Sequence, residues 1–166
     1  KPQRIILTDI ENFLQVQLPT NVEFQKVDVC SKDFLKRFQD KITLVLCSQA
    51  LHEAVDIFKA VQNLFTVLPV GGTTLIFDYS QDGLQSTYEQ SRQTSLEAYR
   101  HFIMDFTNLM KYGLDTNEGI KEFWEEGFFP KVPGKTHLFF HGEMYMVVYI
   151  ARQWGEVKPI PPELIP

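Results

Sequence analysis

The sequence predicts an α/β fold with a mostly parallel sheet that ends in an antiparallel hairpin. Short apolar runs typical of buried strands, such as Ile42 to Cys47, alternate with segments whose apolar residues recur at helical spacing. Strands that alternate with helices indicate parallel crossover units. Near the C-terminus, two strand-like segments, His137 to Phe140 and Tyr145 to Ala151, are joined only by His141 to Glu143, which predicts the hairpin.

Composition limits the number of domains and the classes of partner. The 166 residues, of which 44% are hydrophobic, can bury one core, so we expect one α/β domain over residues 1–153 and a proline-rich tail or linker over 154–166. The formal charge of −5 and the scattered basic residues argue against nucleic-acid or acidic-membrane binding. Because no apolar run reaches membrane-spanning length, we expect a cytoplasmic protein with reduced, partly buried thiols at Cys30 and Cys47.

The first half of the chain contains three expected strands. The first runs from Arg4 to Ile10, the second from Asn21 to Val29, and the third from Ile42 to Gln49. The second has a mixed pattern that suits an edge position. We expect short helices between them, over Glu11 to Leu18 and over Lys32 to Phe38.

The middle of the chain shows helical spacing on both sides of a fourth strand. A helix that begins near Ala54 should end at Pro69, and a strand should follow from Thr73 to Tyr79. Gln81 to Gly83 is predicted as a turn. A long helix is then expected over Ser86 to Tyr112, since its apolar residues recur every three or four positions.

One more helix is expected before the hairpin. Thr116 is a suitable N-cap, because a threonine oxygen can accept a hydrogen bond from the first turn of a helix. Ile120, Phe123 and Trp124 would form its apolar face, and Gly127 is predicted to end it.

Five motifs occur in an order that matches a known family. They are Asp9 after the first visible strand, Asp28 after the second, Leu44 to His52 at the third, Leu68 to Gly72 before the strand with Asp78, and Trp124 to Phe128 before the hairpin. On these residues the chain resembles a class I S-adenosylmethionine-dependent methyltransferase from that family's second strand onward. The resemblance covers roughly residues 4 to 152 and implies a Rossmann-like methyltransferase sheet.

The resemblance implies which residues would contact the cofactor, S-adenosylmethionine. They are Asp9, Asp28, Val29, Ser48 and Gln49. The acid at Asp9 would accept hydrogen bonds from the ribose hydroxyls, a task that suits a carboxylate because it offers only acceptors. Asp28 would receive the adenine amino group, with Val29 beside the ring. Ser48 and Gln49 would lie at the carboxyl end of a central strand, where open α/β sheets place their ligands.

Each candidate also has a purely structural interpretation. An acid at a strand end, such as Asp9 or Asp28, is often a turn residue or a helix cap. His52 is a weak candidate for a catalytic base, because its ordinary pKa lies near neutrality, but it could instead help to begin the following helix. His137 and His141 flank the hairpin without a nearby cysteine, so we expect no metal site there.

The family's first strand and its glycine-rich cofactor loop have no counterpart before Arg4. In the family's sheet this strand lies between those that begin here at Arg4 and Ile42. Its removal would leave unpaired backbone groups, each of which costs about 1–3 kcal/mol when buried and unsatisfied. Therefore an upstream segment supplies the strand, a partner domain or chain supplies it, or the two neighbouring strands pair directly in a smaller sheet.

These routes separate three hypotheses about function. With the strand supplied, the chain would be part of an active methyltransferase that acts on a small-molecule acceptor, although this chain alone should be inactive and should not bind the cofactor tightly. The alternative is a vestigial pseudo-methyltransferase that forms a structural or regulatory half of a larger enzyme, for example one of the bipartite phosphoethanolamine type. A free-standing interaction module is the third class.

Overall fold

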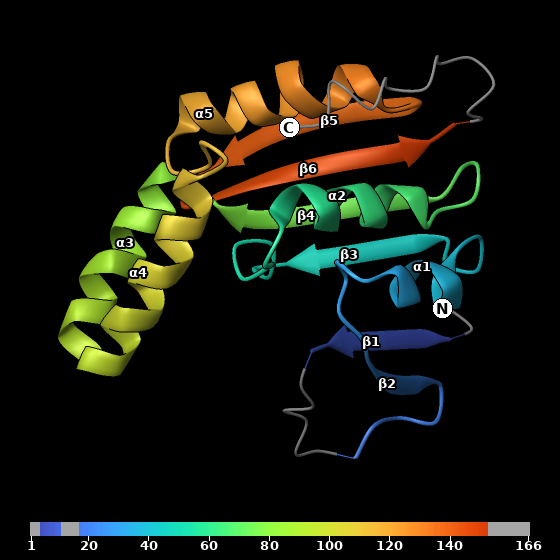
Figure 1. Ribbon diagram of the computed structural model, residues 1–166, viewed down its shortest axis with the longest axis horizontal. Coiled ribbons are helices and arrows are strands. Elements are labelled where there is room, and N and C mark those ends of the chain that lie inside the picture. Colours follow the sequence, from blue (N-terminus) through green and yellow to red (C-terminus); the bar gives the residue numbers. More distant parts are fainter. Residues whose placement is uncertain (1–3, 11–16, 153–166) are drawn as a thin grey trace.

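The computed structural model describes residues 4–10 and 17–152, and its strands form two sheets (Figure 1). The strands are β1 (Ile5–Asp9), β2 (Val22–Lys26), β3 (Leu44–Ser48), β4 (Thr73–Tyr79), β5 (Gly134–His141) and β6 (Met144–Ala151). β1 and β2 pair in parallel as one sheet. The second sheet has the order β3-β4-β6-β5, in which β3 and β4 are parallel and β6 is antiparallel to β4 and β5. This arrangement confirms the predicted α/β class with a terminal antiparallel hairpin.

Helices connect the strands, and each α-helix begins at a side-chain cap. They are α1 (Lys32–Phe38), α2 (Ile57–Thr66), α3 (Gln81–Thr94), α4 (Leu96–Met110) and α5 (Asn117–Lys121), which continues into the π-helical η1 (Glu122–Phe128) and the 3-10 turn η2 (Phe129–Lys131). The capping residues are Ser31, Asp56, Ser80, Ser95 and Thr116. Each accepts a hydrogen bond from an amide in the first turn, which satisfies a donor that the helix leaves unpaired.

Several predicted elements are confirmed. The helix Lys32–Phe38 and the strand Thr73–Tyr79 have the bounds that the sequence predicted, and Thr116 caps the last α-helix. Most of the helix expected over 11–18, and the whole tail expected over 154–166, lie outside the described residues. Those two predictions, and the domain boundary at residue 153, therefore stay predictions.

Three predictions about helices are wrong. Gln81–Gly83 is the first turn of α3, because Ser80 caps that helix. The long helix divides into α3 and α4 at Ser95, whose backbone is extended with φ −166° and ψ 163°. Gly127 does not end the last helix, since the π-helical turn continues to Phe128.

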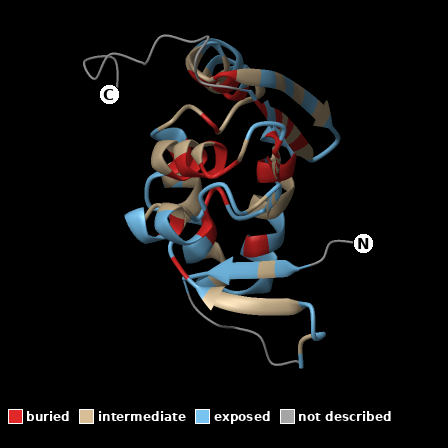
Figure 2. Cartoon of the chain, turned by 90° about the vertical axis from the view of Figure 1, so that its right-hand side faces the viewer, coloured by how far each residue is buried: buried red, intermediate tan, exposed pale blue. Residues whose placement is uncertain are grey.

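The core lies between the four-stranded sheet and one layer of helices. Strand residues Ile76, Val147 and Tyr149 are almost fully buried there. Phe65 of α2 stacks on Tyr149 with ring centroids 4.1 Å apart, and Trp124 of η1 is fully buried nearby. Figure 2 shows that buried residues concentrate in this region and that the β1–β2 pair carries almost none.

β1 and β3 point in the same direction but do not pair with each other (Figure 1). Among the described residues, β1 pairs only with β2, and β3 pairs only with β4. The smaller sheet, in which β1 and β3 would close up directly, is therefore not the arrangement that the chain adopts. The β2 strand lies at an edge, as predicted.

Candidate functional site

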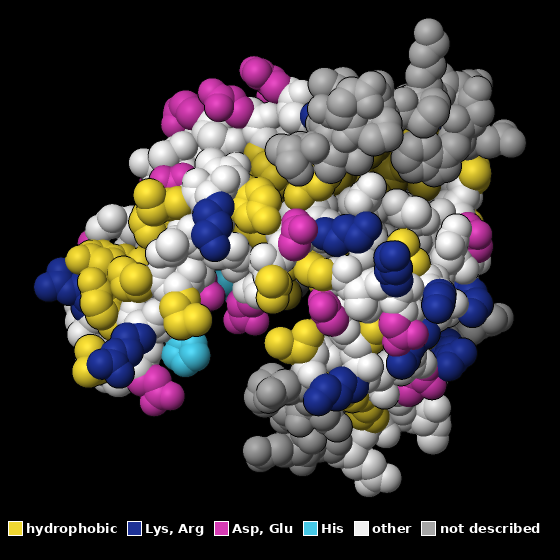
Figure 3. All heavy atoms as spheres, viewed as in Figure 1, with side chains coloured by type: hydrophobic (Ala, Val, Ile, Leu, Met, Phe, Trp, Pro, Cys, Tyr) yellow, Lys and Arg dark blue, Asp and Glu magenta, His cyan; other side chains and the backbone are white. Residues whose placement is uncertain are grey.

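A cleft of about 670 Å³ separates β1 from β3. β1 contributes Ile6, Thr8 and Asp9 to its lining, and β3 contributes all of Leu44–Ser48. Apolar residues of α1, of α2 and of the turn that ends α2 form the helical side of the cleft, and these are Phe34, Phe38, Ala60, Leu64 and Val67. The carboxyl ends of β1 and β3 face the notch that Figure 3 shows between the α3–α4 hairpin and the N-terminal strands.

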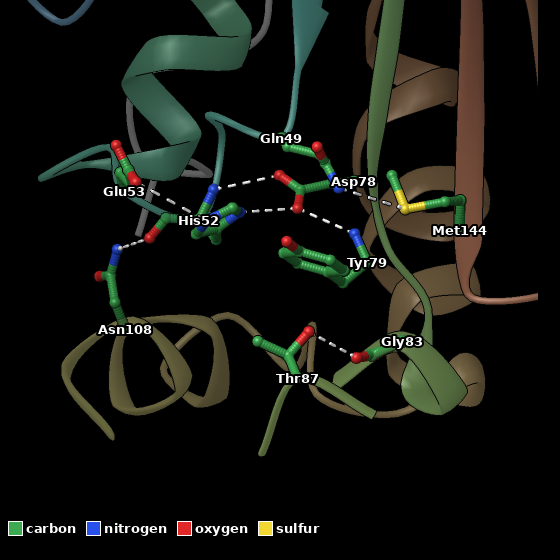
Figure 4. Close-up of polar contacts among 9 residues, drawn as sticks. All are labelled: Gln49, His52, Glu53, Asp78, Tyr79, Gly83, Thr87, Asn108 and Met144. Carbon is green, nitrogen blue, oxygen red and sulfur yellow. Dashed lines mark hydrogen bonds and ion pairs between the residues drawn. The ribbon is translucent and has the colours of Figure 1, made fainter. Parts of the chain in front are cut away.

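The cleft brings together four of the five residues predicted to contact a cofactor. Asp9, Asp28, Val29 and Ser48 all line it, although they come from three different segments of the chain. Gln49 is not among the lining residues, and its side-chain amide lies 3.9 Å from the sulfur of Met144 (Figure 4). Asp9, Asp28 and Ser48 meet there because β1, β2 and β3 all end near the same edge, where α/β sheets bind ligands.

Both acids also hold local backbone. One oxygen of Asp9 accepts a hydrogen bond from the amide of Ile10 at 2.6 Å. Oδ1 of Asp28 accepts one from the amide of Cys30 at 2.8 Å, which is an Asx-type turn. Each carboxylate has further acceptor positions beyond the one used locally. Each acid therefore has a structural role that leaves acceptor positions for a ligand.

A buried histidine–aspartate pair lies next to this cleft, at the ends of β3 and β4. Nδ1 of His52 lies 2.7 Å from Oδ1 of Asp78, and the backbone amide of His52 donates to Oδ2 at 3.2 Å (Figure 4). Oδ1 of Asp78 also accepts from the amide of Tyr79 at 2.8 Å. Because Asp78 is only 1% exposed, its carboxylate needs these donors in place of water.

The loop that carries His52 is fixed from the α4 side. The amide nitrogen of Asn108 donates to the carbonyl oxygens of His52 and Ala54, at 3.1 and 2.8 Å. The alternative in which His52 helps to begin a helix is wrong, because α2 begins at Ile57 and takes its cap from Asp56. His52 therefore belongs to a loop that its own partners hold in place.

Burial and the charges around His52 act on its pKa in opposite directions. Burial acts to lower the pKa of His52, but the hydrogen bond and negative charge of Asp78, with further charge from Asp105 and Glu53, raise that pKa above its usual value. Burial also raises the pKa of the Asp105 carboxyl, and His52 and His101 act in the opposite direction. A carboxylate on Nδ1 fixes the ring orientation and leaves Nε2 as the atom that can exchange a proton.

The pairing of His52 with Asp78 was not predicted from the sequence. The two residues are 26 positions apart, and their contact depends on the parallel pairing of β3 with β4. The sequence did contain a signal for this contact. Each of the two residues comes after an apolar strand-like run, and these two runs form the neighbouring strands β3 and β4.

Within residues 4–10 and 17–152, no cluster of three or more His, Cys, Asp or Glu side chains could hold a metal ion. No described helix is long and apolar enough to cross a membrane. Cys30 and Cys47 are free thiols of intermediate exposure, and burial raises the pKa of Cys47 to about 12.

Several solved structures that superpose on this chain are methyltransferases. The plantazolicin methyltransferase BamL, solved with a desmethyl analogue and SAH, superposes with a TM-score of 0.61 at 10% identity, over 80% of this chain and 61% of that one. The CurJ carbon methyltransferase gives 0.53 at 10% identity, over 81% of this chain and 36% of that one. The chain thus has the class I S-adenosylmethionine-dependent methyltransferase fold.

A methyltransferase of Methanococcus maripaludis, described as putative and dependent on S-adenosyl-L-methionine, gives a TM-score of 0.50 at 10% identity, over 82% of this chain and 57% of that one. The chain spans only about one third to two thirds of the length of these structures. Its sequence matches no protein-family model and no curated protein.

Proposed function

We propose that this chain is a methyltransferase-like domain that binds S-adenosylmethionine at the rim of the cleft, where the carboxyl ends of β1 and β3 lie, and serves transfer to a small-molecule acceptor. The observation that supports the proposal most directly is that Asp9, Asp28 and Ser48 line one cleft beside the carboxyl ends of parallel strands. The fold, shared with structures that hold SAH, supports the choice of cofactor.

The residues present fit parts of that cofactor. Asp9 would accept hydrogen bonds from the ribose hydroxyls, and Asp28 would accept one from the adenine amino group, since a carboxylate offers several acceptor positions. Val29 would lie against the adenine ring, and Ser48 would face the reacting end. When bound, the cofactor supplies an electrophilic methyl group, and the domain would contribute chiefly by positioning.

His52 is the residue that we propose for proton transfer from the acceptor. Asp78 holds Nδ1, so Nε2 is the atom that would take the proton. Oε1 of Glu53 lies 4.0 Å from Nε2 and adds negative charge that favours the protonated ring.

We also propose that another domain or chain completes the sheet by placing one strand between β1 and β3. Both edges that face the cleft belong to strands whose pairing, among the described residues, is on the opposite side. Two parallel edges above an apolar helical floor suit an added parallel strand, because such a strand would pair its backbone on both sides and bury alternate side chains.

The alternative is a vestigial domain that serves as a structural or regulatory half of a larger enzyme. The observation in its favour is that both acids already accept hydrogen bonds from local backbone amides, Asp9 from Ile10 and Asp28 from Cys30. In that case the same residues would persist for folding, and the cleft would take a strand but no cofactor.

Calorimetry with S-adenosylmethionine tests the cofactor proposal. Residues 1–166 alone should show no tight binding, and the chain together with whatever completes its sheet should bind one molecule. In the completed protein, Asp9→Ala and Asp28→Ala should each weaken binding by about 1–3 kcal/mol, or roughly 5- to 150-fold, because each removes an acceptor from a charge-assisted hydrogen bond.

Two results would count against this assignment. A micromolar one-to-one site on residues 1–166 alone would show that the cleft is already complete. Unchanged affinity in both aspartate variants would remove the cofactor from this cleft. If the completed protein binds no cofactor but remains folded, the vestigial alternative is favoured.

A further inference from the structure

Helix α4 has three faces, and contacts within the described chain account for two of them. Phe102 and Leu109 form the buried face, where Phe102 packs against Tyr88 of α3 with ring centroids 5.7 Å apart. Asn108 lies on the second face and donates to the carbonyl of His52 in the candidate site. The third face takes part in neither contact.

This third face is apolar and exposed. Leu96, Ile103 and Met110 recur at every seventh position and are 65%, 39% and 54% exposed. Because seven residues make almost two full helical turns, the three side chains form one line along the helix, which we call the α4 stripe. Met104, which is 69% exposed, widens the apolar surface on one side. Single exposed apolar residues are ordinary, whereas a line of them indicates an interaction surface.

The position of the helix leaves this surface accessible to another molecule. The α3–α4 hairpin extends away from one end of the four-stranded sheet (Figure 1), and hydrophobic side chains gather on the surface of this hairpin (Figure 3).

The α4 stripe is complementary to itself when two copies meet with their α4 helices antiparallel. Ile103 lies midway between Leu96 and Met110. A two-fold axis beside Ile103 therefore places this side chain against its own copy, and places Leu96 against Met110 of the second copy. Every apolar residue of the stripe then meets an apolar residue.

The charges beside the stripe favour the same arrangement. Glu97 follows Leu96 and Lys111 follows Met110, both charged side chains are exposed, and neither takes part in an ion pair of the described chain. In the antiparallel pair, Glu97 of each copy lies within about 3 Å, along the helix, of the level of Lys111 in the other, which a lysine side chain spans. A parallel pair would instead bring like charges together, which is unfavourable.

We propose that the α4 stripe is a dimer interface, at which two copies of this chain pack their α4 helices antiparallel about a two-fold axis at Ile103. The contact needs neither the cofactor nor a strand between β1 and β3, so it does not rest on the proposed function. Because a single helix stripe is smaller than a standard interface, the dimer is weak and dissociates on dilution. The face that carries Asn108 stays outside the interface, so the candidate site remains accessible in the dimer.

Sedimentation velocity of the natural full-length polypeptide that contains these residues tests the proposal. We expect a change from monomer to dimer as the protein concentration rises. Ile103→Glu places two like charges against each other at the axis and should weaken the dimer by at least about tenfold. Val70→Glu is the matched control, because Val70 is 68% exposed and lies in the turn after α2. It should leave the association unchanged.

A charge exchange tests the antiparallel direction. Glu97→Lys and Lys111→Glu should each weaken the dimer by roughly threefold or more, because each replaces an attraction by a repulsion, and the double variant should recover it. The double variant opposes the dipole of α4 at both ends, so its recovery cannot come from a more stable helix.

Disulfide formation then tests the position of the axis, in a background with Cys30→Ser and Cys47→Ala. Ile103→Cys should join two copies on oxidation, whereas Leu96→Cys should not, since the two Leu96 positions lie about 20 Å apart along an antiparallel pair. Equal crosslinking of both variants would indicate parallel helices and would overturn the proposal. A monomer at every concentration would overturn it, and so would a dimer that persists unchanged in Ile103→Glu.

Discussion

The two sheets of this molecule differ in how much of their environment the described chain supplies. The four-stranded sheet has a helical layer and a core in which Ile76, Val147 and Trp124 are fully buried. The β1–β2 sheet has no fully buried strand residue, and Ile5 and Leu7 are each 37% exposed. One region is a packed layer structure, and the other is a pair of strands held beside it.

The difference shows that the candidate site spans a well-packed region and a less packed one. Burial of apolar surface is the main favourable term in folding, and it is concentrated under the four-stranded sheet. Asp9 and Asp28 come from the less packed region, whereas Ser48 and His52 come from the packed one. A ligand in the cleft would therefore join a rigid half-site to a half-site whose position depends on other contacts.

Truncation of a large core side chain should show the largest contrast. Trp124→Ala should lower the free energy of unfolding by about 3–5 kcal/mol, because it leaves a cavity under the sheet. Leu7→Ala should cost less than about 1 kcal/mol, since that side chain is already partly in water. Urea unfolding of both variants measures the contrast. Equal costs would mean that β1 is as well packed as the core.

The next largest effect is expected from Asn63, whose hydrogen bonds join α2 to the segment that follows β2. The side-chain amide of Asn63, which is fully buried in α2, donates to the carbonyl of Val29 at 2.7 Å and to that of Ser31 at 3.4 Å. Asn63→Leu removes both donors and should cost about 1–3 kcal/mol. Hydrogen exchange should quicken at Cys30 and in α1 while the amides of β4 and β6 stay protected.

Gln62→Leu is the matched control for this joint, because its residue lies next to Asn63 on the same helix and is only partly buried. It should change neither exchange nor stability by much. If Asn63→Leu leaves hydrogen exchange at Cys30 and in α1 unchanged, the packing of α1 rather than the asparagine holds the N-terminal strands.

The sequence could predict elements whose signals are local. Lys32–Phe38 was predicted to the residue from its amphipathic pattern, and the structure adds Ser31 as its cap. The division of one long helix into α3 and α4 was missed, since Leu96, Tyr99, Ile103, Phe106 and Met110 keep helical spacing on one side of the break. The break is marked locally by Ser95, whose hydroxyl accepts a hydrogen bond from the amide of Ala98 and caps α4.

The two acids of the candidate site could be predicted from the sequence, but the contact between His52 and Asp78 could not. Asp9 is the last residue of β1 and Asp28 lies two residues beyond β2, so their meeting at one edge follows from parallel topology. The contact of His52 with Asp78 required the register of β3 on β4. Gln49 was predicted to face the cofactor, yet its backbone has φ +49° and its side chain approaches Met144.

The smallest expected effect is a pH dependence that belongs to the packed region alone. Because Asp78 raises the pKa of His52 despite burial, the folded state binds a proton more tightly than the unfolded state does. The stabilisation is fully present below the ordinary histidine pKa of about 6.5 and is lost as pH rises through the folded-state value. The stability lost in His52→Gln relative to the parent should thus be greater at low pH than at high pH.

Urea unfolding from pH 5.5 to 9 (about the range over which histidine titrates) would show this difference. The NMR titration of the His52 ring gives the folded pKa directly, and Asp78→Asn should lower it. If His52→Gln lost equal stability at both ends of the range, the pair would act through hydrogen bonding alone. Protonation of His52 would then add nothing to the stability of the four-stranded sheet.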